Sequence, residues 1–324
     1  MSKASYRIID YYLRPSKNVE RKMILEVLKS IAKKQHIDYS YIGMGSLGFI
    51  DFRIFHKELM IKDMVSIEKK ASDKDRFEFN KPLKINMVYT DSSTALRKLD
   101  IKNKDSVIWL DYDGNFNKDM VKDFTYIAAN ARPYSIALLT CRQSLDYYLD
   151  LDNNGTIDNY ERFTEEFEEF VPYGIKKKDF ERNNFSKLIQ QMLVNAMDTK
   201  LSEINAASEA SEQLRFKQVF FFTYSDGAPM LTIGGIMLKE SSLKTFNSKF
   251  RTKTMDFIRE KDKSYEIDIP ILTKKETDFL NKYLPEDSMQ EFITNTNLHK
   301  IPEPERKSYF SLYRFLPDFR ETSY

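Results

Sequence analysis

The sequence is poor in the residues that build disulfides and cysteine-rich metal sites. Cys141 is the single cysteine among 324 residues. A lone cysteine excludes an intramolecular disulfide and a zinc site made of several cysteines. No apolar run approaches the length of a membrane span, and the first residues lack the apolar core of a signal peptide. We therefore expect a cytoplasmic protein without a membrane segment.

An excess of charge of one sign is also missing. Lysine and arginine number 51, and aspartate and glutamate number 49, so that the formal net charge is only +2. This balance does not indicate a nucleic-acid-binding protein, because such proteins typically carry a basic surface. Hydrophobic residues make up 41% of the chain, which is enough to build a core. The length indicates one large domain with additions, or two domains.

Short apolar segments alternate with helical patterns in the first half of the chain. Apolar residues recur at helix spacing over residues 18–35. Strands are expected at residues 39–42, 64–68, 84–91, 106–114 and 134–141. Strands that alternate with helices pair in parallel, so the pattern predicts a doubly wound α/β sheet.

The alternation stops after the fifth expected strand. Residues 143–215 are rich in charge and mostly helical in pattern. Two β-rich segments then flank Asp226-Gly227-Ala228-Pro229, which is typical of a hairpin. We expect a Rossmann-like domain over residues 1–240, with a helical insertion at about 143–215, followed by a C-terminal extension over residues 241–324.

Glycine is scarce, yet three of the 9 glycines form the motif Gly43-x-Gly45-x-x-Gly48. The motif follows the first strand and precedes a helical segment, where the backbone can approach a ligand closely. Glu68 ends the second strand about 20 residues later, where a carboxylate can hold ribose hydroxyls. The pattern favours a nucleoside-type ligand, and a tight turn without a ligand is the structural alternative.

Acidic residues also follow the third and fourth strands, at Asp91, Asp111 and Asp113. The carboxyl ends of parallel strands meet at one edge of a sheet, so these side chains predict a shared crevice. Asp111 and Asp113 are the candidate catalytic residues, because paired carboxylates can hold an acceptor, act as a base or bind a divalent ion. For each acid the alternative is a helix N-cap or a turn.

Several segments resemble the motifs of a bacterial family of O-methyltransferases with the class I S-adenosylmethionine-dependent fold. They include LRPSKNVERKM, YIGMGSLGFIDFRIFHKEL, VIWLDYDG and IDIPILTKKETDFLNKYLP. The resemblance covers most of residues 13–140 and resumes at the hairpin and at residues 267–285. It implies a parallel sheet that ends in an antiparallel hairpin, S-adenosylmethionine as the cofactor, and methyl transfer to an oxygen of a small or macromolecular acceptor.

The resemblance also implies a place for each site residue. The turn Gly43–Gly48 would lie near the methionine part of the cofactor, Glu68 at the ribose, Asp91 near the adenine and Asp111 at the methyl-transfer face. The common form of the first motif has an acid before the first glycine, whereas Tyr41-Ile42 stands there in this chain.

Two other functions stay open at this point. One is a catalytically silent nucleotide-sensing or interaction module on the same fold, and the other is an NAD(P)-dependent oxidoreductase. The C-terminal extension is expected to shape the acceptor site or a homo-oligomer interface. Arg14 and Lys17 precede the first expected helix, and we expect them to be solvated, with folding over an anionic substrate as the alternative.

The insertion begins with DLDNNGTIDNYE, which matches a calcium-binding loop. The expected oxygen ligands are Asp150, Asp152, Asn154, Thr156, Asp158 and Glu161. The helix that follows is poor in the apolar residues of calcium sensors, and no second loop pairs with this one. We therefore expect a structural feature that binds calcium weakly, with a dissociation constant of roughly 10⁻⁴ M or higher.

Overall fold

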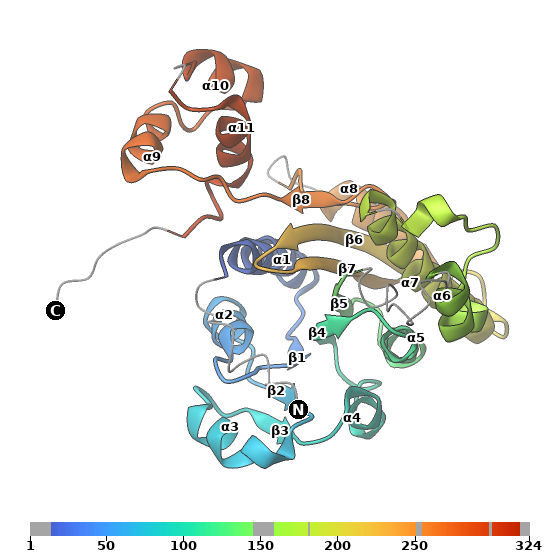
Figure 1. Cartoon of the computed structure of the whole chain (residues 1–324). Helices are drawn as coiled ribbons and strands as arrows, with labels where there is room; N and C mark the ends of the chain where they lie inside the picture. The colour runs from blue at the N-terminus through green and yellow to red at the C-terminus, as the bar shows by residue number, and fades with distance from the viewer. Residues whose placement is uncertain (1–13, 145–158, 181, 251–254, 298–299, 318–324) are drawn as a thin grey trace, which may run out of the picture.

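The computed structural model describes residues 14–144, 159–180, 182–250, 255–297 and 300–317 (Figure 1). The strands are β1 (Ser40–Gly43), β2 (Met64–Ile67), β3 (Asn86–Val88), β4 (Ser106–Asn115), β5 (Ile136–Arg142), β6 (Leu214–Ser225), β7 (Pro229–Lys239) and β8 (Tyr265–Ile267). The α-helices are α1 (Pro15–Gln35), α2 (Ile50–Leu59), α3 (Lys74–Asn80), α4 (Ser92–Lys98), α5 (Lys118–Asn130), α6 (Asn159–Phe167), α7 (Arg182–Asn205), α8 (Glu240–Phe250), α9 (Lys274–Asn281), α10 (Met289–Asn295) and α11 (Glu303–Leu312). The short 3₁₀ helices are η3 (Ala71–Asp73), η4 (Glu168–Phe170) and η5 (Lys177–Phe180).

The strands form one sheet in the order β3-β2-β1-β4-β5-β7-β6-β8. β1 pairs in parallel with both β2 and β4, so the strand order reverses at β1. β7 runs antiparallel to its neighbours β5 and β6. The arrangement confirms the predicted class I methyltransferase sheet, in which parallel strands are followed by an antiparallel hairpin. In such sheets ligands bind outside the carboxyl ends of the strands, where the order reverses.

Helices cover both faces of the sheet, with α1 and α2 on one face and α4, α5 and α7 on the other (Figure 1). Successive residues of β4 alternate between the two cores, as the period of a strand requires. Val107 and Trp109 pack toward α1, whereas Ile108 and Leu110 pack toward α5. This alternation points the next odd-numbered residue, Asp111, toward α1.

The C-terminal region adds to the sheet and also forms a small core of its own. β8, which the sequence did not predict, pairs in parallel with β6. Helices α9, α10 and α11 pack around Leu280, Phe292 and Tyr309, and Figure 1 shows them as a group beyond β8. Lys22 on α1 donates to the carbonyl oxygens of Phe315 and Leu316 at 2.8 and 3.2 Å. The first helix is thereby tied to the residues that follow α11.

The insertion between β5 and β6 contributes α6 and α7, and α7 packs against α5. The predicted helical character of the insertion is confirmed for the part that the structure describes. Within that same part of the chain, none of the helices combines the length and the apolar character that a membrane span needs.

Candidate active site

The glycine turn connects β1 to α2. Gly43 is the last residue of β1, and Gly45 and Gly48 lie in the turn that follows. A Cβ on Gly43 would lie 2.4 Å from the hydroxyl of Tyr41, and one on Gly45 would lie 2.4 Å from the ring of Phe49. Both positions therefore require glycine for packing alone, and the structural explanation of the motif holds whether or not a ligand approaches.

Glu68 follows β2 directly, and its carboxyl group reaches the glycine turn. The amide of Ser46 donates to Glu68 Oε1 at 2.8 Å, and the amide of Gly45 donates to Ser66 Oγ at 3.0 Å. Burial raises the pKa of Glu68 to about 7; the hydrogen bond from Ser46 opposes this shift, and the charge of Asp113 adds to it. The structure thus brings together the two elements that the sequence predicted for a nucleoside site.

Asp91 is the N-cap of α4. Its Oδ1 accepts a hydrogen bond from the amide of Thr94 at 2.8 Å, and its side chain is exposed. This hydrogen bond holds the pKa of Asp91 below its usual value. The N-cap alternative describes what Asp91 does in this structure, and a contact with adenine stays a prediction.

Asp111 lies in the second half of β4, on the face that α1 covers. Lys17 Nζ is 2.7 Å from Asp111 Oδ1 and 2.8 Å from Glu20 Oε2. The Lys17 side chain has no exposed surface, and that of Asp111 is 14% exposed. The prediction of a solvated Lys17 ahead of the first helix is wrong, because α1 begins at Pro15 and its first turn lies against the sheet.

The ammonium group of Lys17 is enclosed by aromatic and polar groups. Its Nζ lies 4.4 Å from the ring centre of Trp109 and 3.5 Å from Thr140 Oγ1. Burial disfavours the ionised form of Asp111, but the charge and hydrogen bond of Lys17, together with the charges of Arg14 and Arg21, outweigh burial and lower the pKa of Asp111. For Glu20, burial outweighs the same ammonium group and raises the pKa. Asp111 is therefore held ionised, which makes it a weak base near neutral pH.

The turn of the β6–β7 hairpin fixes the start of α1. Asp226 accepts hydrogen bonds from the amides of Ser16 and Lys17 at 3.1 and 2.9 Å, and it lies 3.9 Å from Arg14 Nε. A carboxylate at a helix N-terminus satisfies free amides and interacts well with the helix dipole. Sequence reasoning missed Glu20 and the pairing of Lys17 with it, although the i,i+3 spacing of opposite charges was visible.

Asp113 is exposed and has a different environment from that of Asp111. The pairing of β4 with β5 shifts register between Asp111 and Asn115. Asp113 acts on Glu68 through its charge, whereas Asp111 pairs with Lys17. The two carboxylates that the sequence suggested as a catalytic pair thus have different partners.

The calcium-like loop falls almost entirely outside the described residues. This applies to Asp150, Asp152, Asn154, Thr156 and Asp158. Glu161 is exposed in the first turn of α6. In the parts of the chain that the structure describes, no three His, Cys, Asp or Glu side chains lie together so as to hold a metal ion. Calcium binding by residues 150–161 stays a prediction.

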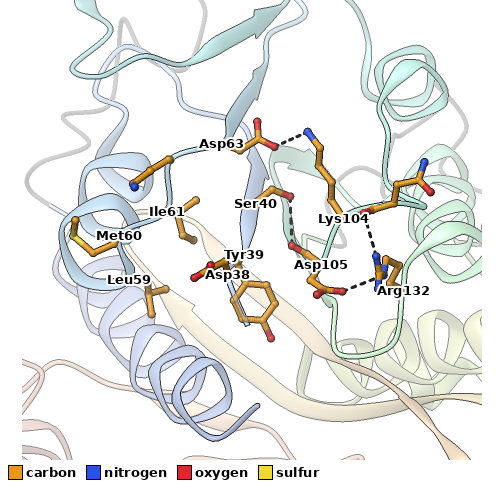
Figure 2. Close-up of a pocket in the computed structure, with 12 residues that line it drawn as sticks. Asp38, Tyr39, Ser40, Leu59, Met60, Ile61, Asp63, Lys104, Asp105 and Arg132 are labelled. Atoms are coloured by element: carbon orange, nitrogen blue, oxygen red, sulfur yellow. Dashed lines mark hydrogen bonds and ion pairs between the residues drawn. The ribbon is translucent and has the colours of Figure 1, made fainter. Parts of the chain in front are cut away.

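A hollow of about 520 Å³ lies at the opposite edge of the sheet, at the amino ends of β1 and β4 (Figure 2). Ion pairs cross its wall, with Lys104 2.6 Å from Asp63 and Arg132 3.3 Å from Asp105. This hollow is remote from the glycine turn and from Glu68, so it forms no part of the candidate site.

A second hollow, of about 610 Å³, lies beside the start of α1. Its walls include Ser16, Tyr224, Asp226 and Glu266. The ring of Tyr224 is centred 5.8 Å from Lys17 Nζ, so one wall residue of this hollow lies beside the buried ammonium group.

No curated protein has a sequence that matches the chain. Among solved structures, the chain is similar to an O-methyltransferase from Bacillus cereus in complex with SAH, at 12% identity over 73% of this chain and 92% of that one, with a TM-score of 0.36. It is also similar to the O-methyltransferase TomG from Streptomyces achromogenes in complex with SAM, at 12% identity, 70% and 90% coverage and a TM-score of 0.35. A third is cofactor-bound Rv0187 from MTB, at 10% identity, 67% and 79% coverage and a TM-score of 0.36.

The sequence family described as "Putative O-methyltransferase" matches residues 9–324. The matched region includes the glycine turn, Glu68, the Lys17–Asp111 pair and the C-terminal helices. The resemblance seen in the sequence is confirmed, and the chain belongs to this O-methyltransferase family.

Proposed function

We propose that the protein transfers the methyl group of S-adenosylmethionine to an oxygen atom of an acceptor at the carboxyl ends of β1, β2 and β4. Family membership supports methyl transfer and favours it over the oxidoreductase alternative. The observation that carries the site is the hydrogen bond from Ser46 to Glu68, which joins the glycine turn to the end of β2. These elements flank the strand at which the sheet order reverses, where ligands bind in open α/β sheets.

The residues at this edge fit a nucleoside ligand. Glu68 is half-buried and presents a carboxyl group that can accept hydrogen bonds from ribose hydroxyls. In the described part of the chain, the hydroxyls of Tyr41 and Ser46 are buried without a hydrogen-bond partner. Buried polar atoms without partners are rare in folded proteins, and groups on a bound ligand would satisfy them.

When bound, S-adenosylmethionine supplies a methyl group that its sulfonium has already activated. The residues of the chain then have mainly to align the acceptor oxygen and exclude water. Asp111 is ionised and partly accessible, so we assign it the role of accepting a hydrogen bond from the acceptor hydroxyl. Lys17 holds this carboxylate in place from inside the protein.

The hollow beside α1 offers room for the acceptor. Its volume of about 610 Å³ lies in the range of ligand sites, and its wall residue Tyr224 lies 5.8 Å from the ammonium group that holds Asp111. Hydroxyl and carboxyl side chains line it, including Ser16, Thr223 and Glu266, which suits an acceptor with polar groups.

Calorimetric titration with S-adenosylmethionine, S-adenosylhomocysteine, NAD and NADP tests the proposal. We expect the first two compounds to bind and the nicotinamide nucleotides to bind more weakly or not at all. Asp111→Asn should keep cofactor affinity within about threefold and reduce methyl transfer to any acceptor found. NAD binding that is tighter than that of S-adenosylmethionine would contradict the proposal.

A further inference from the structure

A second buried ion pair lies beside the glycine turn. Arg21 on α1 donates through Nε to Asp51 Oδ1 in the first turn of α2. The two side chains are only 3% and 5% exposed. Removing two charges from water costs about as much as their attraction returns, so stability alone does not explain why a buried pair stands at this place.

The hydroxyl of Tyr41 lies near the same charges. It is buried and has no hydrogen-bond partner among the described residues. Burial raises the pKa of this hydroxyl; the charges of Asp51 and Asp111 add to the shift, and that of Arg21 opposes it. A Cβ on Gly43 would meet this hydroxyl at 2.4 Å. The unpaired hydroxyl therefore lies against the last residue of β1, within range of the charges of Asp51 and Arg21.

The charges around this point are closely balanced, because burial raises the pKa of Glu20 and favours its neutral form. Arg21 and Lys17 face three carboxyl groups, those of Asp51, Asp111 and Glu20. Burial lowers the pKa of Arg21, but the charges of Asp51, Asp111 and Glu20 outweigh burial and raise it. A ligand that carries either a carboxylate or an ammonium alone would change this buried charge balance. A zwitterion brings both and leaves the balance unchanged.

We infer that Arg21 and Asp51 bind the amino-acid end of S-adenosylmethionine. Arg21 would bind the carboxylate of the ligand and Asp51 its ammonium group, with the Tyr41 hydroxyl as a further hydrogen-bond partner. The inference rests on the proposed function, which puts the methionine part of the cofactor at the glycine turn. In the free protein the two side chains pair with each other, and the zwitterion exchanges that pair for two. Asp51 on α2 then supplies the acid that is missing before Gly43, where the chain has Tyr41.

Three nucleosides with different groups at this end test the inference by calorimetry, each compared between a variant and the wild type. S-adenosylhomocysteine carries both charged groups, decarboxylated S-adenosylmethionine keeps the ammonium group, and 5′-methylthioadenosine lacks the whole amino-acid end. The variants are Arg21→Gln, Asp51→Asn and Tyr41→Phe. Lys29→Gln is the matched control, because Lys29 forms an ion pair with Glu58 between the same two helices at an exposed position.

We expect Arg21→Gln to weaken S-adenosylhomocysteine binding roughly 10- to 100-fold while 5′-methylthioadenosine changes less than about threefold. Asp51→Asn should also weaken decarboxylated S-adenosylmethionine, which Arg21→Gln should spare. Tyr41→Phe keeps the ring, so it should fold, and we expect a loss of roughly 3- to 10-fold for S-adenosylhomocysteine alone. Lys29→Gln should change none of the affinities.

Two failures are distinguishable. If the variants weaken all three nucleosides equally, or none of them, the pair has only a structural role and the inference is wrong. If none of the nucleosides binds the wild type, the proposed function itself is wrong. Should Arg21→Gln and Asp51→Asn not fold, the inference is tested by the Tyr41→Phe variant and by the ratio of the wild-type affinities for S-adenosylhomocysteine and 5′-methylthioadenosine. A wild-type preference for S-adenosylhomocysteine over 5′-methylthioadenosine of less than about threefold would overturn the inference.

Discussion

Glu68 and Asp111 stand on the two strands that flank β1, at the same edge of the sheet, in opposite electrostatic environments. Burial raises the pKa of Glu68 to about 7, and its hydrogen-bond donor is a backbone amide of the glycine turn. Asp111 is only 14% exposed, but the ammonium group of Lys17 at 2.7 Å contributes to a lowered pKa. The position at a strand end therefore does not define the role of a carboxyl group. The helix that packs over the strand end does.

Among the substitutions that test this difference, removing the Lys17 ammonium group should have the largest effect on stability. Lys17→Met would leave Glu20 and Asp111 without the ammonium group that lies between them, and we expect the unfolding free energy to fall by about 3–5 kcal/mol. Urea unfolding at pH 7 measures this. The difference in unfolding free energy between the wild type and Lys17→Met should narrow as pH falls through the lowered pKa of Asp111, because a protonated Asp111 no longer forms an ion pair with Lys17.

The control for Lys17→Met is Lys29→Met, which removes a partly exposed lysine of the same helix from its pair with Glu58. Surface pairs contribute little, so we expect a change of about 1 kcal/mol or less. Equal losses of unfolding free energy in the two variants would show that the buried Lys17 pair stabilises the fold no more than the exposed Lys29 pair.

Glu68 should matter more for binding than for folding. Glu68→Ala removes the expected hydrogen bonds to the ribose, which corresponds to about 1.5–3 kcal/mol, or roughly 10- to 150-fold in affinity for S-adenosylhomocysteine. Calorimetry on a variant with native circular dichroism measures the change. An affinity within about twofold of the wild type would remove Glu68 from the cofactor site.

The raised pKa of Glu68 also predicts a pH dependence of stability. The folded protein holds this proton more tightly than the unfolded chain, whose glutamate titrates at its ordinary pKa of 4.5. The contribution of Glu68 to stability is thus fully present below that pH and declines as pH rises through about 7. Glu68→Gln should remove this decline. The unfolding free energy of the variant minus that of the wild type should be about 1–2 kcal/mol higher at pH 8 than at pH 5. Parallel curves of unfolding free energy against pH for the two proteins would contradict the raised pKa of Glu68.

Asp91 should show the smallest effect. Asp91→Asn keeps an N-cap side chain on α4, so stability should change by less than about 0.5 kcal/mol. Affinity for S-adenosylhomocysteine should stay within about threefold of the wild type. A loss of more than about tenfold, measured by calorimetry, would instead support the contact with adenine that the resemblance implies.

The parts of the site that sequence predicted are those whose signals are local. The glycine turn and Glu68 lie close in sequence, and a strand-turn-helix pattern with an acid at the next strand end brings them together. The hairpin was likewise visible in the turn residues around Gly227. The alternating pattern of the first half was sufficient to predict the parallel strands and their order of appearance.

The Lys17–Asp111 pair is different, because its two residues are 94 positions apart. The pair depends on how α1 docks across β4, and Asp226, more than 200 residues from α1, fixes that docking. No local pattern encodes such a contact. For the same reason a lysine in a charged segment was expected in solvent, and the three-residue strand β8 was too short to show a period.

A ¹³C NMR titration of Glu68 and Asp111 shows whether the cofactor binds at this edge of the sheet. The carboxyl carbons are followed with and without saturating S-adenosylhomocysteine. We expect Glu68 to titrate near pH 7 in the free protein and at clearly lower pH when the nucleoside is bound, because ribose hydroxyls stabilise the carboxylate. Asp111 should stay ionised in both states over the neutral range, held by Lys17. If S-adenosylhomocysteine leaves the titration of Glu68 unchanged, the cofactor does not occupy this edge of the sheet and the account is wrong.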